Sequence, residues 1–529
     1  MTRSTLLWIC NALLFVSVAF TLSFLFFHLK KGCHFDDAYM FMRYADNIIN
    51  HHVYGWNPGE RAFGCTSMVY TFFVALLKWL SLFVGFHSSV RNDGTILILS
   101  SFSWGMLSLW LMYKIIGRIN RQSFAIPQEF IRITFAFILF SAPFNFNLTT
   151  GMDTMASVFF NTLVIYAAFL ATRNSSLFNI IKLSFAIYLA FLTRPDSIIL
   201  NGSFSFLLLI YFRVPAKKLL SFLGSMVLIL GADTLIKYFY FGNPLPLPFY
   251  VKKGGFYEGF MGVADWNAVD FFLNFIYNYG IYFIIPGMFL DKWNMRAYLV
   301  FLLPLLLFFG YFFTVLQIMG NQSRFYVPGL PYIIIGAFYF LASIEYTKYF
   351  KGSFVLPVLF TLIIIAILTF SYPYKFYLLQ KETNKEMAIT GEQSTNKPKL
   401  NDFEATEKFS WLIKDLPSGS VVAATEHGYP SAANPEINIL DLSGLHNPYF
   451  IRHGWTNDII KSQMPEVIWM PHTNYTVLRY RIVHDSTFQK DYTYFPGAIN
   501  FGIAIKKNSP FYNNLTGKLS LINNQFASK

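Results

Sequence analysis

The chain has 529 residues, of which 54% are hydrophobic, 19% aromatic and only 13% charged, and its mean hydropathy is +0.43. A soluble domain carries about 25% charged residues, so this composition excludes a disordered chain, a coiled coil and a soluble enzyme with a small membrane anchor. The net charge is +13, and most of the excess lies in residues 1–371, in short loops between apolar runs. That is the positive-inside pattern of a membrane protein rather than the basic stripe of a nucleic-acid-binding protein, and we expect no nucleic-acid partner.

Residues 1–371 predict a polytopic α-helical membrane domain, because a helix needs about 20 apolar residues to cross a bilayer. The first apolar run lacks a small-residue cleavage site, so we interpret it as a retained span and not as a signal peptide. About eleven runs are candidate transmembrane helices, and they cover residues 5–28, 94–116, 131–144, 153–172, 178–193, 197–213, 219–241, 271–290, 297–318, 326–345 and 353–371.

Residues 66–89 are also apolar, and whether they cross the membrane decides the orientation of every later span. If they form a juxtamembrane helix on the outer face, the later basic loop residues share the cytoplasmic side with Arg3; if they cross, those residues move outside, against the positive-inside rule. The residues concerned are Lys114, Arg118, Arg121, Arg132, Arg213, Lys217, Lys218, Lys292, Arg296, Lys348 and Lys351. We therefore predict a juxtamembrane helix here and a C-terminal region outside the cytoplasm.

This orientation places the ionisable residues near the span ends on one side of the membrane, the outer face. They are Asp36, Asp37, Glu60, Asp153, Arg194, Asp196, Lys252 and Arg324. Ionisable side chains near membrane depth are costly and by default suggest a functional site. We expect these residues to share a single outward-facing cavity.

The first outer loop, residues 29–93, begins with an acidic pair. Apolar residues recur at helical spacing after it, which predicts an amphipathic helix over residues 37–50 that lies on the membrane. Asp36 and Asp37 can cap this helix and favour its dipole. Alternatively, one of them acts as a general base for an acceptor hydroxyl while the other orients the hydroxyl or holds a cation. Cys33 and Cys65 are candidates for a disulfide if this loop is extracytoplasmic.

Five segments carry a resemblance to a known family. They are the acidic pair with residues 43–67 (RYADNIINHHVYGWNPGERAFGCTS), then residues 150–154 (TGMDT), 193–196 (TRPD), 240–252 (YFGNPLPLPFYVK) and 320–328 (GNQSRFYVP). In this order they resemble the integral-membrane GT-C glycosyltransferases, and most of all the bacterial branch that includes the mycobacterial terminal arabinofuranosyltransferase. The chain departs from that branch at Asp153, where Glu is usual, at residues 247–249, where an Asn-Thr pair is common, and at residues 320–323, which lack acidic and Trp residues. These departures weaken the transfer of an arabinose donor to this chain but leave the reaction class unchanged.

The resemblance implies an enzyme of the bacterial cytoplasmic (inner) membrane that takes a sugar from a polyprenyl-phosphate donor. The acceptor would be an envelope glycan or glycolipid outside the cytoplasm. It implies Asp36 or Asp37 as the catalytic base, Arg194, Lys252 and Arg324 as the groups that stabilise the donor phosphate, and Glu60, Asp153, Asp196 and Tyr250 as sugar- or acceptor-binding residues. A divalent cation is left open, since no ligand set in the sequence requires one.

Local alternatives stand beside these roles. Arg194 can simply pair with Asp196, the three cations can cap span ends or snorkel to the interface, and Asp153 can serve as the N-cap of the following span. Each alternative explains one residue at a time. The functional interpretation explains why all of them map to the same face.

Residues 372–400 are polar and predict a linker, and residues 401–529 predict a small α/β domain outside the membrane. A helix is expected at residues 402–415, and strands are expected at residues 421–424, 437–442, 467–470, 476–483 and 499–505. Residues 425–428 (TEHG) and 441–445 (DLSGL) resemble the tail of the same enzymes. Glu426, His427 and Asp441 do not indicate a hydrolase triad, because no serine in an elbow-like context accompanies them. We expect this domain to bind the acceptor or to support the outer loop.

A function of another class is the alternative: a transporter or flippase of a lipid-linked or small polar solute. A carrier predicts charges buried in mid-span and related halves with broken helices. The sequence has no internal repeat, and its notable charges lie at span ends. A membrane scaffold would leave the outer acidic pair without a role. We therefore predict a glycosyltransferase.

Overall fold

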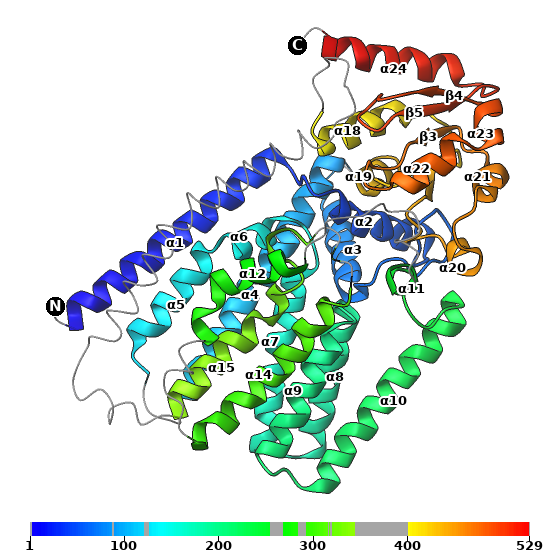
Figure 1. The fold of residues 1–529 in the computed structure, drawn as a ribbon. Helices are drawn as coiled ribbons and strands as arrows, with labels where there is room; N and C mark the ends of the chain where they lie inside the picture. Colours follow the sequence, from blue (N-terminus) through cyan, green and yellow to red (C-terminus); the bar gives the residue numbers. More distant parts are fainter. Residues whose placement is uncertain are drawn as a thin grey trace.

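The computed structural model describes residues 3–86, 89–120, 126–253, 268–283, 292–315, 317, 320–343 and 400–527. It consists of a bundle of apolar helices with a smaller α/β domain at one end (Figure 1). The predicted linker at residues 372–399 and the predicted span at residues 353–371 lie outside the described residues.

The helical part confirms a multi-pass membrane protein. Its elements are α1 (Arg3–Lys31), α2 (Asp36–Asp46), the π-helical turn η1 (Asn47–His51), α3 (Met68–Phe83), α4 (Val90–Asn120), α5 (Gln128–Phe140), α6 (Ala142–Thr149), α7 (Thr154–Arg173), α8 (Leu177–Thr193), α9 (Ser197–Tyr211), α10 (Ala216–Phe241), α11 (Leu247–Lys253), α12 (Ala268–Tyr279), α14 (Lys292–Phe312), the 3₁₀ turns η2 (Asn321–Ser323) and η3 (Val327–Gly329), and α15 (Leu330–Ser343).

Within the described residues, six helices are long and apolar enough to cross a membrane, or seven if α5 and α6, bent by 58°, form one broken span. The expected count of about eleven stays a prediction. The expected spans at residues 178–193 and 197–213 appear as α8 and α9, which have 17 and 15 residues. The apolar segment at residues 66–89 appears as α3, a helix of 16 residues, which is short of the length that a span requires.

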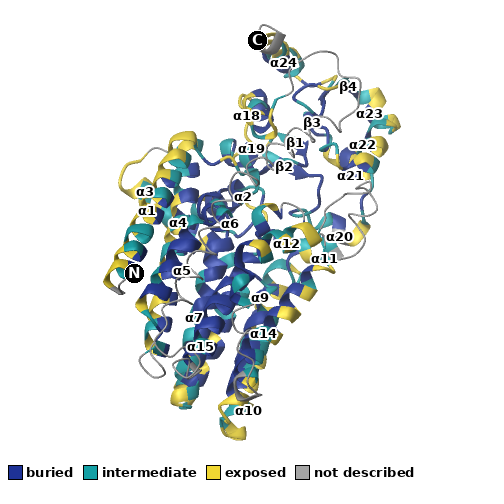
Figure 2. Cartoon of the chain, turned by 60° about the vertical axis from the view of Figure 1, so that its left-hand side comes forward, coloured by how far each residue is buried: buried dark blue, intermediate teal, exposed yellow. Residues whose placement is uncertain are grey.

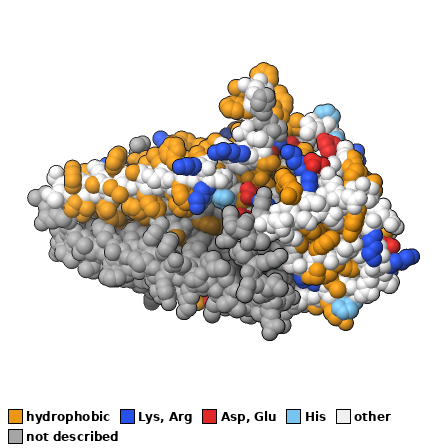
Figure 3. Space-filling model, turned by 90° about the horizontal axis from the view of Figure 1, so that it is seen from above, with side chains coloured by type: hydrophobic (Ala, Val, Ile, Leu, Met, Phe, Trp, Pro, Cys, Tyr) orange, Lys and Arg blue, Asp and Glu red, His pale blue; other side chains and the backbone are white. Residues whose placement is uncertain are grey.

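The outermost helices expose apolar side chains, as lipid-facing helices do. Only 22% of the apolar window of α1 and 17% of that of α10 is buried, against 83% for the window that contains α15. Figure 2 shows the contrast between the buried helices of the bundle and α10, and the view from above shows hydrophobic side chains along the arm that α1 forms (Figure 3). Trp8, Phe15 and Phe239 are among the exposed residues.

The C-terminal domain contains a five-stranded mixed sheet in the order β2-β1-β3-β5-β4. The two pairs β1–β2 and β1–β3 are parallel, and the pairs β3–β5 and β4–β5 are antiparallel. Its elements are α18 (Asp402–Ile413), β1 (Val421–Ala424), α19 (Gly428–Ala433), β2 (Asn438–Asp441), α20 (Tyr449–His453), α21 (Asp458–Gln463), β3 (Val467–Trp469), α22 (Thr476–Val483), α23 (Ser486–Asp491), β4 (Tyr492–Phe495), β5 (Ile503–Lys506) and α24 (Tyr512–Ala527).

The expected helix at residues 402–415 is confirmed as α18, which begins with a capping box between Asn401 and Glu404. The strand expected at residues 476–483 is wrong, because this segment forms helix α22. Leu478 and Ile482 are its buried residues, and their spacing of four puts both on one helical face. The strand β4 was not anticipated, and β5 begins at Ile503 rather than at residue 499.

The helix after the acidic pair is present as α2 and η1, and protein covers most of α2. Eight of the 11 residues of α2 are buried, because α2 packs against α3 and α4 of the bundle and against α19 of the C-terminal domain. Its residues share one hydrophobic core with those of the C-terminal sheet. The predicted helix is therefore confirmed, and α19 of the C-terminal domain covers the face of α2 that does not pack on the bundle.

Two charged side chains of α2 bind the two ends of α19. Both carboxylate oxygens of Asp36 accept backbone N–H hydrogen bonds, from Gly428 at 3.0 Å and from Tyr429 at 2.7 Å. The buried guanidinium of Arg43 donates hydrogen bonds to the carbonyl of Ser431 in α19 and to the carbonyls of Pro435 and Ile437, which follow the end of α19. A negative group at the start of a helix and a positive group at its end both complement the helix dipole. The C-terminal domain is thus docked on α2 by directional, charge-assisted bonds.

Gly428→Ala is expected to loosen this docking. A Cβ atom at Gly428 would lie 2.0 Å from the backbone oxygen of Asp36, which cannot move away as a flexible side chain would. Overpacking of this kind costs about 1–3 kcal/mol, so the midpoint of thermal unfolding in detergent should fall. Gly517→Ala in α24, where nothing lies within 4 Å of the added atom, is the matched control. An equal midpoint for both variants would contradict the tight docking.

Candidate active site between the bundle and the C-terminal domain

Three charged residues from distant segments meet beside the start of α2. Asp37 lies on the first turn of α2, Asp153 precedes α7, and Arg324 lies between the turns η2 and η3 that lead into α15. Nη1 of Arg324 is 3.8 Å from Oδ2 of Asp37, and Nη2 is 3.8 Å from Oδ1 of Asp153. One guanidinium therefore faces two carboxylates, at distances that exceed a direct hydrogen bond.

The same cluster contains buried polar atoms that lack a hydrogen bond. Among the described residues, Oδ1 of Asp153 and Nε of Arg324 have no hydrogen-bond partner, although both residues are buried. Asp153 occupies the N-cap position of α7, but its side chain does not cap the helix. Buried polar groups are normally satisfied. These atoms are therefore available to a ligand.

A second arginine lies next to this cluster. Arg194 follows α8 and binds Asp196 with two nitrogens, at 3.2 and 2.7 Å. Arg194 and Arg324 both lie against the ring of Phe325, at 5.2 and 5.7 Å from its centroid. The ion pair between Arg194 and Asp196 is thus present, and it is also adjacent to the cluster.

Lys252 on α11 adds a third cation. The pKa of Lys252 is lowered to about 8, mainly by burial; Arg324 and Arg194 contribute to this shift and Asp37 opposes it. These influences show that Lys252 lies within electrostatic reach of all three residues. Helix α11 is held in place by the bond from Leu247 N–H to the carbonyl of Phe63, at 2.8 Å.

The two adjacent aspartates have different surroundings. The carboxylate of Asp36 is occupied by the N–H groups of α19, whereas the side chain of Asp37 remains 31% exposed and faces Arg324. Of the pair, Asp37 is therefore the residue free to act on a substrate. The expectation that one of the two carboxylates is the catalytic base stays a prediction.

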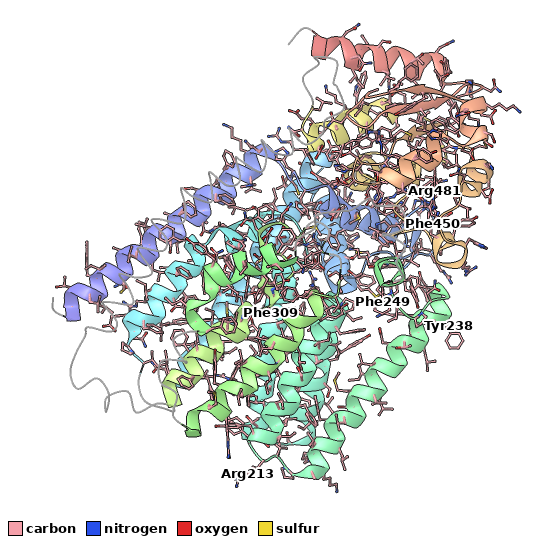
Figure 4. The ribbon with its side chains drawn as sticks, viewed as in Figure 1. Arg213, Tyr238, Phe249, Phe309, Phe450 and Arg481 are labelled. Atoms are coloured by element: carbon pink, nitrogen blue, oxygen red, sulfur yellow. The ribbon has the colours of Figure 1, made fainter. Side chains whose placement is uncertain are left out.

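Two expected site residues lie apart from these contacts. Glu60 is exposed and accepts a hydrogen bond from Asn57 of its own turn, at 3.1 Å. Tyr250 lies on α11 with Lys252, and its ring contacts Phe249, which Figure 4 labels beside the C-terminal domain. Cys33 and Cys65 are free cysteines, so no disulfide joins the first loop here.

Glu426 of the C-terminal domain lies within electrostatic reach of Asp36 and Asp37, although the sequence analysis gave it no role. The pKa of Glu426 is raised to about 8, mainly by burial, and charge repulsion from Asp36 and Asp37 contributes to the shift. Glu426 follows strand β1, whose parallel neighbour is β2. Ligand sites lie at the carboxyl ends of parallel strands, which is the signal that could have identified residues 425–428 and 441–446.

Comparisons with known proteins leave the family of the whole chain open. Residues 391–512 match a family model described as a domain of unknown function, DUF8728. No curated protein matches. One similar solved structure is the archaeal oligosaccharyltransferase AglB from Archaeoglobus fulgidus in complex with an inhibitory peptide and a dolichol-phosphate, with a TM-score of 0.49 and 11% identity over 95% of this chain and 75% of that chain. Similarity at this level does not decide the activity of this chain.

Proposed function

We propose that this protein is a GT-C-type glycosyltransferase that moves a sugar from a polyprenyl-phosphate donor to an envelope glycan or glycolipid. The observation that carries the proposal is the meeting of Asp37, Asp153 and Arg324 at the end of a membrane bundle. Two further cations, Arg194 and Lys252, lie within reach. Carboxylates beside a group of cations suit a reaction that deprotonates a hydroxyl and releases a phosphate.

The proposed reaction uses each group once. Asp37 accepts the proton of the acceptor hydroxyl, whose oxygen bonds to the anomeric carbon of the sugar. The bond between that carbon and the phosphate oxygen breaks, and the polyprenyl phosphate leaves with the electron pair. Arg324 is suited to stabilise the new negative charge, since its planar guanidinium can grip phosphate with two nitrogens. Asp153 would hold sugar hydroxyls.

A divalent cation is not assigned a step. Asp37 and Asp153 offer oxygen atoms that suit such an ion. In the structure the guanidinium of Arg324 lies 3.8 Å from both carboxylates, and the proposal routes no step through a cation.

We place the protein in the bacterial inner membrane, with the candidate site and the C-terminal domain on the side away from the cytoplasm. Arg213 lies at the end of the bundle opposite the C-terminal domain (Figure 4). Arg118 and Arg173 line one pocket with Phe212, so they belong to that same end. Basic residues mark the cytoplasmic side, which supports this orientation.

A strain that lacks the protein tests the proposal. Mass spectrometry of its envelope glycans should show the loss of one sugar, and its lipid extract should accumulate the corresponding polyprenyl-phosphate sugar. The purified protein in vesicles should then transfer that sugar to the truncated acceptor. Unchanged glycans, together with movement of the lipid-linked sugar across vesicles without acceptor, would instead establish the flippase alternative.

The pKa of Lys252 predicts how donor binding depends on pH. Only the protonated amine attracts phosphate, and its pKa lies at about 8, so the KM for the donor should rise as the pH increases from 7 to 9. Lys252→Arg keeps its charge over this range because the arginine pKa exceeds about 12, and its KM should stay flat. Steady-state kinetics with the donor that the strain identifies provides the measurement. The same pH profile for both proteins would remove Lys252 from the phosphate site.

A further inference from the structure

Three potential metal ligands, none of which is assigned a part in sugar transfer, gather at the carboxyl ends of two parallel strands. His427 comes three residues after β1, Asp441 is the last residue of β2, and His446 follows five residues later. Because β1 and β2 are parallel neighbours, their carboxyl ends meet at one sheet edge. One ligand atom from each of the three side chains lies within 4.8 Å of the others.

The cluster is shielded from solvent. The exposed fractions of His427, Asp441 and His446 are 3%, 0% and 3%. Nε2 of His427 lies 2.9 Å from Oδ1 of Asp441, yet among the described residues neither ring nitrogen of His427 forms a hydrogen bond of acceptable geometry. Nε2 can form an ion pair with Asp441, whereas Nδ1 of His427 has no hydrogen bond among the described residues. A buried polar atom without a partner is costly, and a metal ion in the cluster would supply one.

The surrounding residues orient the ligands as the outer shell of a metal site does. Oδ1 of Asp441 accepts hydrogen bonds from the N–H of Ser443 at 2.7 Å and from its hydroxyl at 2.5 Å, and Oδ2 accepts from the N–H of His446 at 2.8 Å. The hydroxyl of Tyr44 lies 3.1 Å from Nδ1 of His446. If Nδ1 donates its proton to this hydroxyl, Nε2 remains as the ligand nitrogen.

The membrane part contributes the rest of the enclosure. Met40 of α2 places its sulfur 3.0 Å from Nε2 of His446, and the ring of Trp56 stacks on His446 at 4.1 Å. Gly64 lies so close that a Cβ atom there would be 2.2 Å from Nδ1 of His446. The cluster is therefore closed by the first loop as well as by the C-terminal domain.

We propose that His427, Asp441 and His446 bind one divalent transition-metal ion of the zinc type, at the place where the C-terminal domain packs against the first loop. Two imidazoles and a carboxylate are a common zinc ligand set, and imidazole favours zinc and its neighbours over magnesium or calcium. Met40 or a water molecule would complete four-fold coordination.

Metal analysis of the full-length protein tests this site without any measurement of sugar transfer. Protein freed of its affinity tag, purified in detergent from zinc-supplemented cells, should contain about one zinc ion per chain. A strong chelator should remove the zinc and lower the midpoint of thermal unfolding, and ZnCl₂ should restore both. Co²⁺ added to the stripped protein should give the visible absorption bands of a tetrahedral site.

Variants assign the ion to the cluster. His427→Gln and His446→Gln should each lose the zinc, whereas His484→Gln should retain it, since His484 is exposed and its ring lies against Tyr480 of the preceding helix, α22. If the two cluster variants fail to fold, the chelation and Co²⁺ measurements on the unaltered protein still decide. The proposal would be overturned if the folded protein contained no zinc and if neither the chelator nor ZnCl₂ changed the midpoint of thermal unfolding. The cluster would then be a polar contact.

Discussion

The Asp37→Asn variant should lose transfer by about 10²–10⁴-fold in kcat, the range expected for removal of a general base, while it folds as the unaltered protein does. Asp37 faces Arg324 across 3.8 Å and, among the residues that the structure describes, its carboxylate forms no hydrogen bond with a backbone group, so we expect this carboxylate not to be needed for packing. The measurement is transfer by purified protein with the donor identified from the deletion strain. Thermal unfolding in the same detergent shows whether the variant is folded.

Asp36→Asn is the matched control, one residue away with the same chemistry. Its carboxylate accepts two N–H bonds from α19, and hydrogen bonds to charged groups contribute about 1.5–3 kcal/mol. This variant should therefore unfold at a lower temperature, and its transfer should recover when the temperature is reduced. Full activity of Asp37→Asn with loss only in Asp36→Asn would reverse the two roles.

Replacing Arg324 by Gln should have the second-largest effect. Loss of one group that stabilises developing charge typically costs about 10²–10³-fold in kcat, and here it also leaves Asp37 and Asp153 without the cation that faces both. Arg324→Lys should recover only part of the rate, because an ammonium keeps the charge but not the planar pair of donors.

The kinetic constants distinguish the roles of Arg324. If it acts on the leaving phosphate, kcat falls more than the KM for the donor rises. Arg118→Gln provides the control, since Arg118 is exposed, lines the pocket that contains Phe212 and bonds to Tyr166. Equal kinetics for Arg324→Gln and Arg118→Gln would exclude Arg324 from the reaction.

The sequence by itself determined the membrane character of the chain and selected the segments that meet at the candidate site. Hydropathy and charge bias are properties of local composition, and they predicted a helical membrane part and a separate α/β domain. The resemblance motifs selected Asp37, Asp153, Arg194, Lys252 and Arg324, which the structure brings together. Local patterns also predicted α18, because its capping box involves only the four residues from Asn401 to Glu404.

Tertiary contacts decided what local pattern leaves open. Asp36 and Asp37 are adjacent residues of the same type, and the sequence does not distinguish them. The N–H groups of residues 428 and 429, almost 400 positions away, bind the carboxylate of Asp36 and leave that of Asp37 open. The sequence also did not predict that α19 covers a second face of α2. An amphipathic helix has the same residue pattern whether its apolar face meets lipid or another domain. Residues 476–483 became a helix although their β-branched composition favours a strand, since burial against the rest of the domain outweighs propensity. The gathering of His427, Asp441 and His446 likewise depends on which strands are neighbours in the sheet, a non-local choice that spacing along the chain does not encode.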